Sequence, residues 1–307
     1  MRETVDAFTD YVEVVAARLG DRVSNWITQC EPWVIAWLGY GVGEHAPGRT
    51  VEADALAAAH HVLLSHGRAA EVLRRVSPRA RVGITIDQVT FHPLTDSPED
   101  LAAVARAQAF RNRWILDPVL KGEYPKLLLE RFAPAEPPVE DGDLEGIAAP
   151  LDFLGINYYT RAIVRADPAS GEPVTIESSD AERTGMGWEV YPDGLFELLV
   201  SLHAEYDLPP LYVTENGAAF PDARSNGTVH DPQRISYVER HVQAIRRAVE
   251  RGVPVNGYFL WSLLDNFEWT HGYSQRFGIV YVDYETLERV PKASYYWYRD
   301  LIAGASR

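Results

Sequence analysis

The fold is set by a stretch at residues 211–217, which reads Leu211-Tyr212-Val213-Thr214-Glu215-Asn216-Gly217. Its apolar run predicts a buried strand, and Glu215 stands where that strand gives way to a polar loop. Residues 28–33, Thr28-Gln29-Cys30-Glu31-Pro32-Trp33, repeat this arrangement after an apolar run at residues 23–28. Each stretch therefore predicts a strand that presents one glutamate at its carboxyl end.

Strand and helix patterns alternate along the chain around these two stretches. Apolar positions at helical spacing predict helices, whereas short and almost continuously apolar runs predict strands buried on both faces. This alternation predicts an α/β fold in which helices cover a parallel sheet. The expected strands are residues 23–28, 81–87, 151–157, 211–214 and 257–262, and the expected helices are residues 3–19, 52–75, 98–116, 192–206 and 231–251.

Composition restricts the class of partner. The 307 residues are 46% hydrophobic and carry a formal net charge of -15. A chain of this length and hydrophobic content can bury a full core. Its negative net charge argues against binding to nucleic acid or to an anionic membrane. We therefore expect one domain over residues 1–307 and a neutral substrate. Cys30 is the only cysteine, and residues 1–6 lack the segments of a signal peptide, so we expect a cytoplasmic protein without an intrachain disulfide.

Two segments are predicted to be surface excursions. Residues 133–145 are rich in Pro, Glu and Asp, and we expect a long surface loop whose acidic part, residues 136–145, is solvated. Residues 162–178 contain two short β-prone runs and are expected to form a hairpin. The dipeptide Asn226-Gly227 predicts a turn.

Three neighbouring histidines raise the question of a metal. The spacing of His60, His61 and His66 does not place all three on one face of a helix, as ligands at i and i+4 would be. Packing within a helical layer is the simpler interpretation. The chain also has no phosphate loop, dinucleotide-binding glycine pattern or zinc-type cysteine pattern, so we expect no metal and no cofactor.

The side chains best suited to catalysis stand at the ends of the predicted strands. In a parallel barrel the catalytic groups lie at the carboxyl ends of the strands, and here these are Glu31, Asp87, Asn157, Glu215 and Trp261. A single glutamate at a strand end is more often a helix cap or half of a salt bridge. Two of them fit glycoside hydrolysis with retention, in which an acid and a nucleophile lie about 5 to 5.5 Å apart.

Longer motifs surround these residues. They are Thr28-x-x-Glu31-Pro32-Trp33, Asp152-Phe-Leu-Gly-Ile-Asn-Tyr-Tyr-Thr160, Val213-Thr-Glu-Asn-Gly217 and Trp261-Ser-Leu-Leu-Asp-Asn-Phe-Glu-Trp269, with residues 39–48 and 187–194 in the same pattern. Along essentially the whole chain, and in this order, they closely resemble glycoside hydrolase family 1. The resemblance implies a retaining β-glycosidase, most often a β-glucosidase, on a (β/α)₈ barrel of the TIM type.

The resemblance also implies roles for individual residues. Glu31 matches the general acid/base, and Glu215 matches the nucleophile that forms the glycosyl-enzyme. Tyr159 matches the tyrosine that hydrogen-bonds the nucleophile. The residues that match substrate-binding positions are Asn157, Glu268, Trp269, Trp261 as the stacking floor, Trp188 as an aglycone-side platform, and Cys30 beside the acid/base.

Two features depart from the family pattern. Family members are considerably longer at the amino end, so the five predicted strands match the fourth to eighth strands of the barrel. The part without a counterpart supplies a Gln and a His-Trp pair that hold the sugar. Cys30 stands where the family has an Asn that bonds the sugar 2-hydroxyl, and a thiol is a weak donor. We interpret Cys30 as a small, half-buried residue rather than a nucleophile, and we expect reduced activity.

An incomplete barrel of about five βα units has open sides. Its two sheet edges carry unpaired backbone groups, and its inner face is apolar. We expect self-association into a homo-oligomer to cover the opening. A separate chain that supplies the missing strands, or a local rearrangement, are the alternatives.

Two functions compete at this stage. The first is a metal-free β-glucosidase-like hydrolase that uses Glu31 and Glu215 on small β-glucosides or oligosaccharides, without nucleic acid or membrane partners. The second is a non-catalytic remnant that serves as a sugar-binding or interaction module. Retention of both carboxylates favours the enzyme, whereas Cys30 and the missing strands favour the remnant. The sequence does not discriminate between glucose, galactose and fucose.

Overall fold

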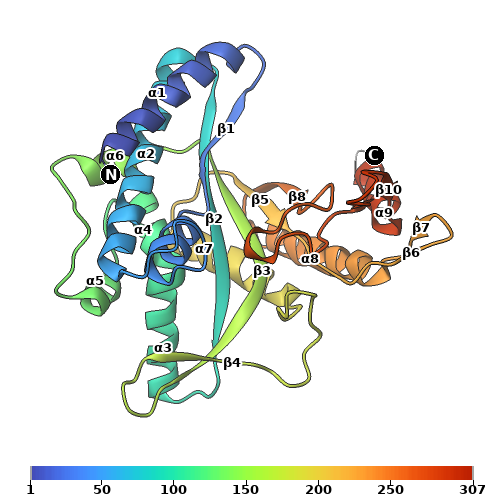
Figure 1. Ribbon diagram of the computed structural model, residues 1–307. Coiled ribbons are helices and arrows are strands. Elements are labelled where there is room, and N and C mark those ends of the chain that lie inside the picture. Colours follow the sequence, from blue (N-terminus) through green and yellow to red (C-terminus); the bar gives the residue numbers. More distant parts are fainter. Residues whose placement is uncertain (1, 306–307) are drawn as a thin grey trace.

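A curled sheet of parallel strands forms the centre of the molecule (Figure 1). The computed structural model describes residues 2–305. The five parallel strands follow the order β1-β2-β3-β5-β8, so each of them pairs with the parallel strand that precedes it in the chain. Their bounds are Asn25–Cys30 (β1), Arg81–Pro93 (β2), Phe153–Ala166 (β3), Leu211–Asn216 (β5) and Val255–Leu260 (β8). The expected parallel sheet and all five expected strands are confirmed, with β1 and β8 each displaced by two residues and β2 and β3 longer than expected.

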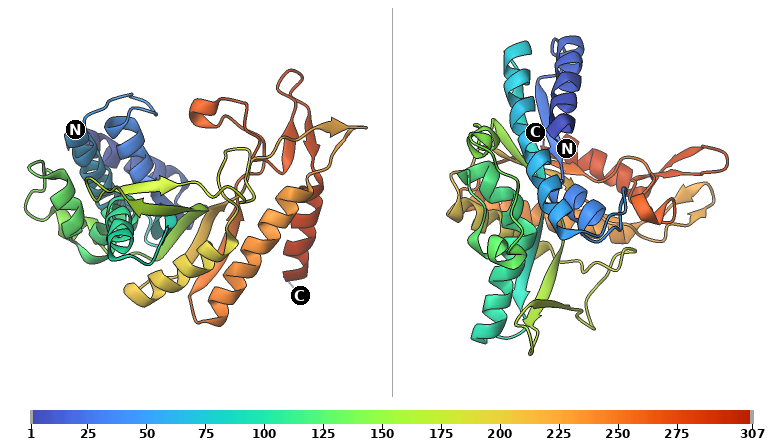
Figure 2. Two further views of the ribbon diagram at one scale, coloured as in Figure 1. Left: turned by 90° about the horizontal axis from the view of Figure 1, so that it is seen from below. Right: turned by 60° about the vertical axis from the view of Figure 1, so that its left-hand side comes forward.

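Helices cover the outer side of this sheet, as the views in Figure 2 show. The helices that follow the expected pattern are Arg2–Leu19 (α1), Glu52–Val76 (α2), Pro98–Gln108 (α3), Pro192–Glu205 (α7) and Pro232–Glu250 (α8). Outward-facing strand residues such as Ile84, Ile156 and Val213 have no exposed surface, and they pack in one core with α2, α4 and α7. Burial of this apolar layer is what holds the helices on the sheet.

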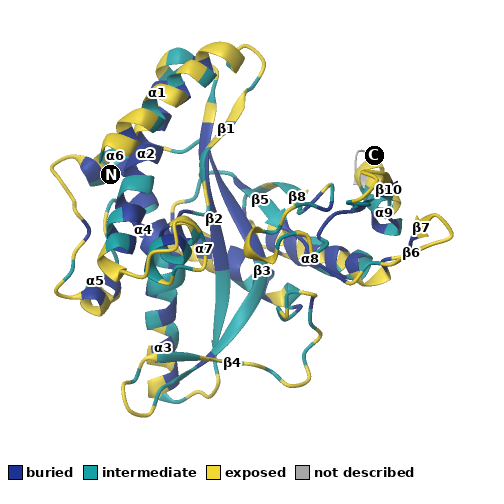
Figure 3. Cartoon of the chain, in the orientation of Figure 1, coloured by how far each residue is buried: buried dark blue, intermediate teal, exposed yellow. Residues whose placement is uncertain are grey.

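The sheet carries apolar residues outward and small or polar residues inward. Along β5, Leu211 and Val213 are buried in the core, while Thr214 and Glu215 are only partly buried. Gly155 on β3 illustrates the crowding of the inner face, because a Cβ there would lie 2.3 Å from the hydroxyl of Thr85. The burial colours of Figure 3 show the same pattern, with the centre of the sheet buried and the outer faces of the helices exposed.

The single helix expected over residues 98–116 is instead three segments. After α3 the backbone widens into a π-helical turn at Ala109–Arg113 (η2) and continues as Trp114–Lys121 (α4). A second π-helical segment, Val34–Gly41 (η1), follows β1. Such widened turns are frequent at functional sites, and both of these lie next to the carboxyl ends of the strands.

The acidic loop is more ordered than its composition predicts. Residues 136–145 were expected to be solvated, yet Asp143 is buried at the start of the short helix Asp143–Ile147 (α6). Its carboxylate accepts hydrogen bonds from Arg2 and His60. The prediction of a solvated stretch is therefore wrong for Asp143, because partners far away in sequence neutralise it. Another short helix, Lys126–Phe132 (α5), precedes this loop.

The other local predictions are confirmed. Residues 173–176 form β4 (Pro173–Ile176), which pairs antiparallel with the end of β3 as the expected hairpin. Asn226 and Gly227 both have positive φ and connect β6 (Arg224–Ser225) to β7 (Thr228–Val229). His60 and His66 are fully buried and bond to Tyr124, Asp143 and Thr28, which makes them packing residues.

The C-terminal part adds a cap that the patterns did not predict. A short 3-10 helix, Trp269–His271 (η3), precedes a hairpin of Val280–Val282 (β9) and Arg289–Pro291 (β10), and the last helix is Ala293–Ala305 (α9). Strands of three residues give too little alternation to be recognised in a sequence.

The barrel is incomplete, and β1 and β8 are its two edges. Ile27 on β1 is 46% exposed and Phe259 on β8 is 57% exposed. Both are apolar side chains that a neighbouring strand would cover in a closed barrel. In the part of the chain that the structure describes, no helix combines the length and the apolar character needed to cross a membrane.

Candidate active site

A row of polar side chains lies across the carboxyl ends of the strands. The sheet register pairs Asp87 on β2 with Asn157 on β3, and Asn157 with Glu215 on β5. Glu31 joins the row because its backbone N–H donates a 2.9 Å hydrogen bond to the carbonyl of Thr85 on β2. The parallel register therefore brings together residues that are far apart in the sequence.

Glu31 is held in an unusual conformation directly after β1. Its φ of 52° lies in the left-handed region, which a non-glycine residue adopts only when its surroundings enforce it. The amide nitrogen of Asn157 donates a 2.7 Å hydrogen bond to its Oε1. Burial, reinforced by the negative charge of Asp87, raises the pKa of Glu31 to about 8. At neutral pH its carboxyl group is therefore protonated.

Glu215 has a different environment. Burial raises its pKa, but hydrogen bonds from Tyr159, Asn157 and Cys30 oppose that effect. The hydroxyl of Tyr159 donates to Oε2 at 2.6 Å. Donors of this kind stabilise the ionised form of a carboxyl group. The two glutamates are thus differentiated, one shielded and protonated, the other surrounded by donors.

Asn157 connects the two glutamates. It is fully buried, and its Oδ1 accepts a 2.7 Å hydrogen bond from the hydroxyl of Thr214. This contact fixes the orientation of the amide, so that its nitrogen faces Glu31. An amide held at one end and donating at the other is a rigid spacer between two carboxyl groups.

Cys30 is exposed, which corrects the expectation that it is half-buried. It ends an edge strand, so no further strand covers it. On its cavity side the thiol lies 3.7 Å from Oε1 of Glu215 and 3.8 Å from the amide nitrogen of Asn157. Shielding from water on that side, together with the charges of Glu215 and Glu31, raises the pKa of the thiol. A protonated thiol is a poor nucleophile, which agrees with the interpretation of Cys30 as unreactive.

A cavity of about 320 Å³ opens above this row. Trp188 contacts Tyr159 in a tilted arrangement, with ring centroids 5.3 Å apart, and Trp269 stacks on His45 at 5.6 Å. Trp269 is 64% exposed, so it projects from the cavity rim and is available for contact. Eight of the nine predicted site residues line this cavity, namely Glu31, Asn157, Tyr159, Trp188, Glu215, Trp261, Glu268 and Trp269. The ninth, Cys30, lines an adjoining hollow on the open side of the sheet.

The loop with Trp261, Glu268 and Trp269 is attached tightly to the strand of Glu215. A Cβ on Gly217, two residues after Glu215, would lie 1.7 Å from the carbonyl oxygen of Trp261. Only glycine permits this approach between the two backbones. The glycine that ends the 211–217 stretch therefore sets the distance between the catalytic strand and the aromatic loop.

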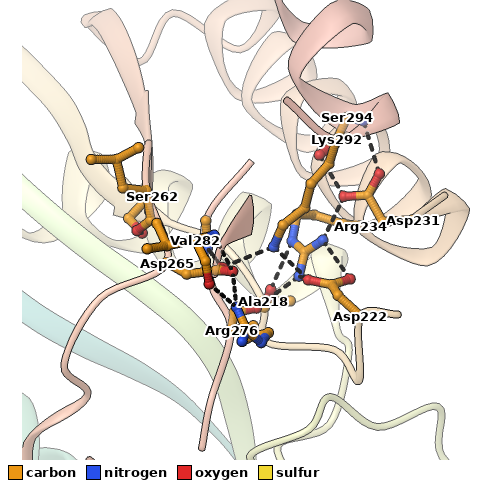
Figure 4. A network of polar contacts seen from close by, with 12 residues as sticks. Ala218, Asp222, Asp231, Arg234, Ser262, Asp265, Arg276, Val282, Lys292 and Ser294 are labelled. Carbon is orange, nitrogen blue, oxygen red and sulfur yellow. Dashed lines mark hydrogen bonds and ion pairs between the residues drawn. The ribbon is translucent and has the colours of Figure 1, made fainter. Parts of the chain in front are cut away.

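Below this contact lies a buried network of charges (Figure 4). Arg234 of α8 pairs with Asp222 at 2.8 Å and with Asp231 at 2.5 Å. Lys292, just before α9, bridges Asp222 and Asp265. Asp222 follows β5 and Asp265 belongs to the loop with Trp261, so the network ties the two loops together. Buried charges in proteins are paired in this way because an unpaired one is very unfavourable.

Three further residues surround Glu31: Asp87, which was expected at the strand-end rim without an assigned role, and Trp33 and Arg111, which were not predicted as site residues. Asp87 forms an ion pair with Arg111, and the guanidinium of Arg111 lies 3.9 Å from the ring centre of Trp33. Trp33 stands in the same motif as Glu31 and Asp87 ends an expected strand, so both had a sequence signal. Arg111 had none, because it enters the site from the π-helical turn η2.

Comparison with known proteins places this architecture among glycosidases. A family model described as Glycosyl hydrolase family 1 matches residues 1–306. Beta-glucosidase A of Thermotoga maritima is 43% identical over 303 residues, which is 98% of this chain and 68% of that protein. A crystal structure of the GH1 beta-glucosidase from Exiguobacterium antarcticum B7 is similar with a TM-score of 0.96 at 43% identity, covering 99% of this chain and 69% of the other. The Thermotoga maritima beta-glucosidase in complex with deoxynojirimycin gives a TM-score of 0.95 at 43% identity over 99% of this chain and 69% of its own.

Proposed function

This chain belongs to glycosyl hydrolase family 1, and we propose that it hydrolyses terminal β-D-glucosyl residues of small β-glucosides by double displacement. The observation that carries the proposal is the contrast between two glutamates in one cavity. Burial holds Glu31 protonated near neutral pH, whereas Glu215 receives donors that favour its ionised form. A pair of carboxyl groups with opposite protonation states is what a retaining glycosidase needs.

In the first step Glu215 acts as the nucleophile. An oxygen of its carboxylate forms a bond to the anomeric carbon of the sugar while the bond from that carbon to the leaving-group oxygen breaks. Glu31 gives its proton to the departing oxygen, so the leaving group departs as a neutral alcohol. Tyr159, which donates to the other oxygen of Glu215, holds the carboxylate in place.

In the second step Glu31, now ionised, takes a proton from water. The water oxygen bonds to the anomeric carbon, the ester to Glu215 breaks, and both glutamates return to their starting states. The charge of Glu215 contributes to the raised pKa of Glu31 in the free enzyme. In the glycosyl-enzyme Glu215 is an uncharged ester, so this contribution is lost and Glu31 can remain ionised to act as the base.

We assign sugar binding to the polar and aromatic side chains of the loop that follows β8. Glu268 has a carboxyl group that can accept hydrogen bonds from sugar hydroxyls, and Trp261 offers an apolar face for the ring. Both line the cavity that contains the two glutamates. The relative from Thermotoga maritima has been crystallised with deoxynojirimycin, which supports a polyhydroxylated ligand of similar size for this cavity.

The exposed Cys30 and the open edge of β1 support a slower reaction than that of a closed barrel. A thiol offers the sugar a weak donor, and contacts to the 2-hydroxyl strengthen in the transition state. A non-catalytic, sugar-binding role is the alternative that these two features favour.

Hydrolysis of an aryl β-glucoside by the wild type and by Glu215→Gln tests the proposal. We expect release of the phenol by the wild type and at least a hundredfold slower release by the variant. Equal rates in the two proteins would show that the activity does not arise at Glu215 and would overturn the proposal.

A further inference from the structure

Tyr159 carries the hydroxyl that bonds Glu215, yet its backbone stands outside the regular sheet. The register between β3 and β5 runs from Leu154 to Asn157, two residues before Tyr159. On the other side of β3, the register with β2 is irregular between Tyr158 and Arg161. A bulge of this kind re-aims side chains, and bulges are frequent next to active sites. The strand ladder alone therefore does not fix the direction of the Tyr159 side chain.

Two buried side chains hold this bulge from the outer side of the sheet. The hydroxyl of Tyr237 on α8 donates a 3.0 Å hydrogen bond to the carbonyl of Tyr159. Asn216 directly follows Glu215 on β5. Its amide nitrogen donates at 2.7 Å to the carbonyl of Tyr158 and at 3.1 Å to the hydroxyl of Tyr237. Because Tyr237 and Asn216 have no exposed surface, water does not substitute for these two donors.

Tyr237 is itself held in place by its neighbours. Its ring stacks on that of His241, one turn further along α8, with ring centroids 4.0 Å apart. Nδ1 of His241 donates a 2.7 Å hydrogen bond to the carbonyl of Tyr237. Tyr258 on β8 donates at 3.0 Å to Oδ1 of Asn216, which fixes the direction of that amide. The hydroxyl that supports Tyr159 thus belongs to a network that joins β3, β5, β8 and α8.

We propose, on the basis of the function proposed above, that Tyr237 is a positioning residue that aims the hydroxyl of Tyr159 at Glu215. Its contacts close a ring with the nucleophile. The ring runs from Glu215 along the chain to Asn216 and across to Tyr237. It continues through the backbone of Tyr159 and returns by the 2.6 Å hydrogen bond to Oε2 of Glu215. Tyr237 lies among apolar side chains of the outer layer, so it acts on the nucleophile without touching the sugar.

The first test is Tyr237→Phe, which removes the hydroxyl and keeps the ring. We expect kcat for an aryl β-glucoside to fall about three- to tenfold, with KM within about twofold of the wild type, because the contacts with the sugar are unchanged. The acidic limb of the kcat/KM profile should move to higher pH, since a less well-aimed Tyr159 stabilises the ionised carboxylate of Glu215 less. Loss of packing alone would lower the melting temperature without moving this limb. An unmoved limb overturns the inference.

The limb reports on Tyr159 because the other groups around Glu215 stay in place. Besides Tyr159, the titratable side chains that act on or respond to the charge of Glu215 include Cys30, Glu31, Asp87 and Glu268. They belong to β1, the residue after it, β2 and the loop after β8, whereas Tyr237 contacts β3 and β5.

A double-mutant cycle tests whether Tyr237 acts through Tyr159. The Tyr159→Phe protein has no hydroxyl to aim, so adding Tyr237→Phe should lower kcat by less than about twofold. The matched control is Tyr206→Phe, which removes a hydroxyl that donates to Asp117 in the core. It should leave kcat unchanged in both backgrounds. If Tyr237→Phe lowers kcat by the same factor with and without the Tyr159 hydroxyl, its role is general packing and the inference is overturned.

An NMR titration separates this inference from the proposed hydrolysis. Labelling of the glutamate carboxyl carbons, with Glu215→Gln to assign the signal, gives the pKa of Glu215 without turnover. We expect this pKa to rise in Tyr159→Phe and to rise by a smaller amount in Tyr237→Phe. If the wild type hydrolyses no glucoside, the proposed function fails, while this titration still tests Tyr237. An unchanged pKa of Glu215 in Tyr237→Phe overturns the inference.

Thermal melting shows whether Tyr237→Phe is folded. If it is not, Tyr258→Phe takes its place, because loss of that hydroxyl releases the amide of Asn216 from the other end of the network. The pKa of Glu215 should then rise in the same direction. An unchanged value in Tyr258→Phe would show that the network does not aim Tyr159.

Discussion

The hydroxyl of Tyr159 donates a 2.6 Å hydrogen bond to Oε2 of Glu215. This bond stabilises the ionised carboxylate and opposes the effect of burial on its pKa. For Tyr159→Phe we expect the pKa of Glu215 to rise, so the acidic limb of the kcat/KM profile moves to higher pH. The value of kcat should fall roughly tenfold to a hundredfold.

Tyr206→Phe is the matched control for this prediction. The hydroxyl of Tyr206 also donates a 2.6 Å bond to a carboxylate, that of Asp117, but in the core. Its loss should lower the melting temperature without moving the pH profile. A Tyr159→Phe enzyme with an unshifted acidic limb would contradict the assigned role of Tyr159.

The raised pKa of Glu31 predicts at which pH the alkaline limb of the kcat/KM profile falls. The acid must be protonated in the free enzyme, and its pKa is raised to about 8 by burial and by Asp87. We expect kcat/KM for an alkyl β-glucoside to fall as the pH rises through about 8, measured by coupled detection of glucose. In Glu31→Gln, kcat for the same substrate should be lower by a factor of about 100 or more. A wild-type limb near pH 5 would contradict the environment described for Glu31.

Cys30 offers a gain-of-function test. Its thiol is a weak donor beside Glu215, 3.7 Å from Oε1, whereas an amide is a strong donor. We expect Cys30→Asn to raise kcat for an aryl β-glucoside about tenfold, because the amide can bond the sugar 2-hydroxyl in the transition state. Cys30→Ala, which removes the thiol without adding a donor, should not raise kcat. Equal rates for Asn and Ala at this position would mean that no sugar contact forms there.

The buried charge network predicts a large loss of stability from one substitution. The amino group of Lys292 lies between Asp222 and Asp265 and is fully buried. For Lys292→Met we expect the free energy of unfolding to fall by about 3 to 5 kcal/mol, because two buried carboxylates lose a partner. Lys126→Met removes an exposed ion pair with Glu130. This substitution should change the free energy of unfolding by less than about 1 kcal/mol. Denaturant titration measures both values.

The two open edges predict association in solution. Ile27 on β1 and Phe259 on β8 are 46% and 57% exposed, and unpaired edge strands tend to add partners. We expect light scattering at micromolar concentration to give a mass above that of one chain. The double variant Ile27→Lys and Phe259→Lys should shift the protein toward monomer. A stable wild-type monomer would show that the edges need no second copy.

Much of the fold followed from the sequence because its signals are local. The apolar run Leu211–Val213 and the helical spacing in α2 and α8 each lie within one element, so the strand and helix order was predictable. The π-helical turn η2 was not, since a widened helical turn has no residue signature within its own five residues. For that reason Arg111 was missed, although it fixes Asp87 at the catalytic wall.

The site itself was predictable to the extent that motifs carried it. Glu31, Tyr159 and Glu215 lie in long motifs, and the structure brings all three to one cavity. The exposure of Cys30 could not be derived from its neighbours in sequence, because it depends on which strand lies beside β1. Asp143 is a similar case, since its buried partners Arg2 and His60 are distant in the chain.

Covalent trapping of Glu215 tests the central claim most directly. A 2-deoxy-2-fluoro-β-glucosyl fluoride slows the second step more than the first, so the glycosyl-enzyme accumulates and can be digested and sequenced by mass spectrometry. We predict that the fluorosugar is attached to Glu215, in the peptide that contains residues 211–217, and that Glu215→Gln is not labelled. A label on Glu31 or Cys30, or labelling that persists in Glu215→Gln, would contradict the assignment of Glu215 as the nucleophile.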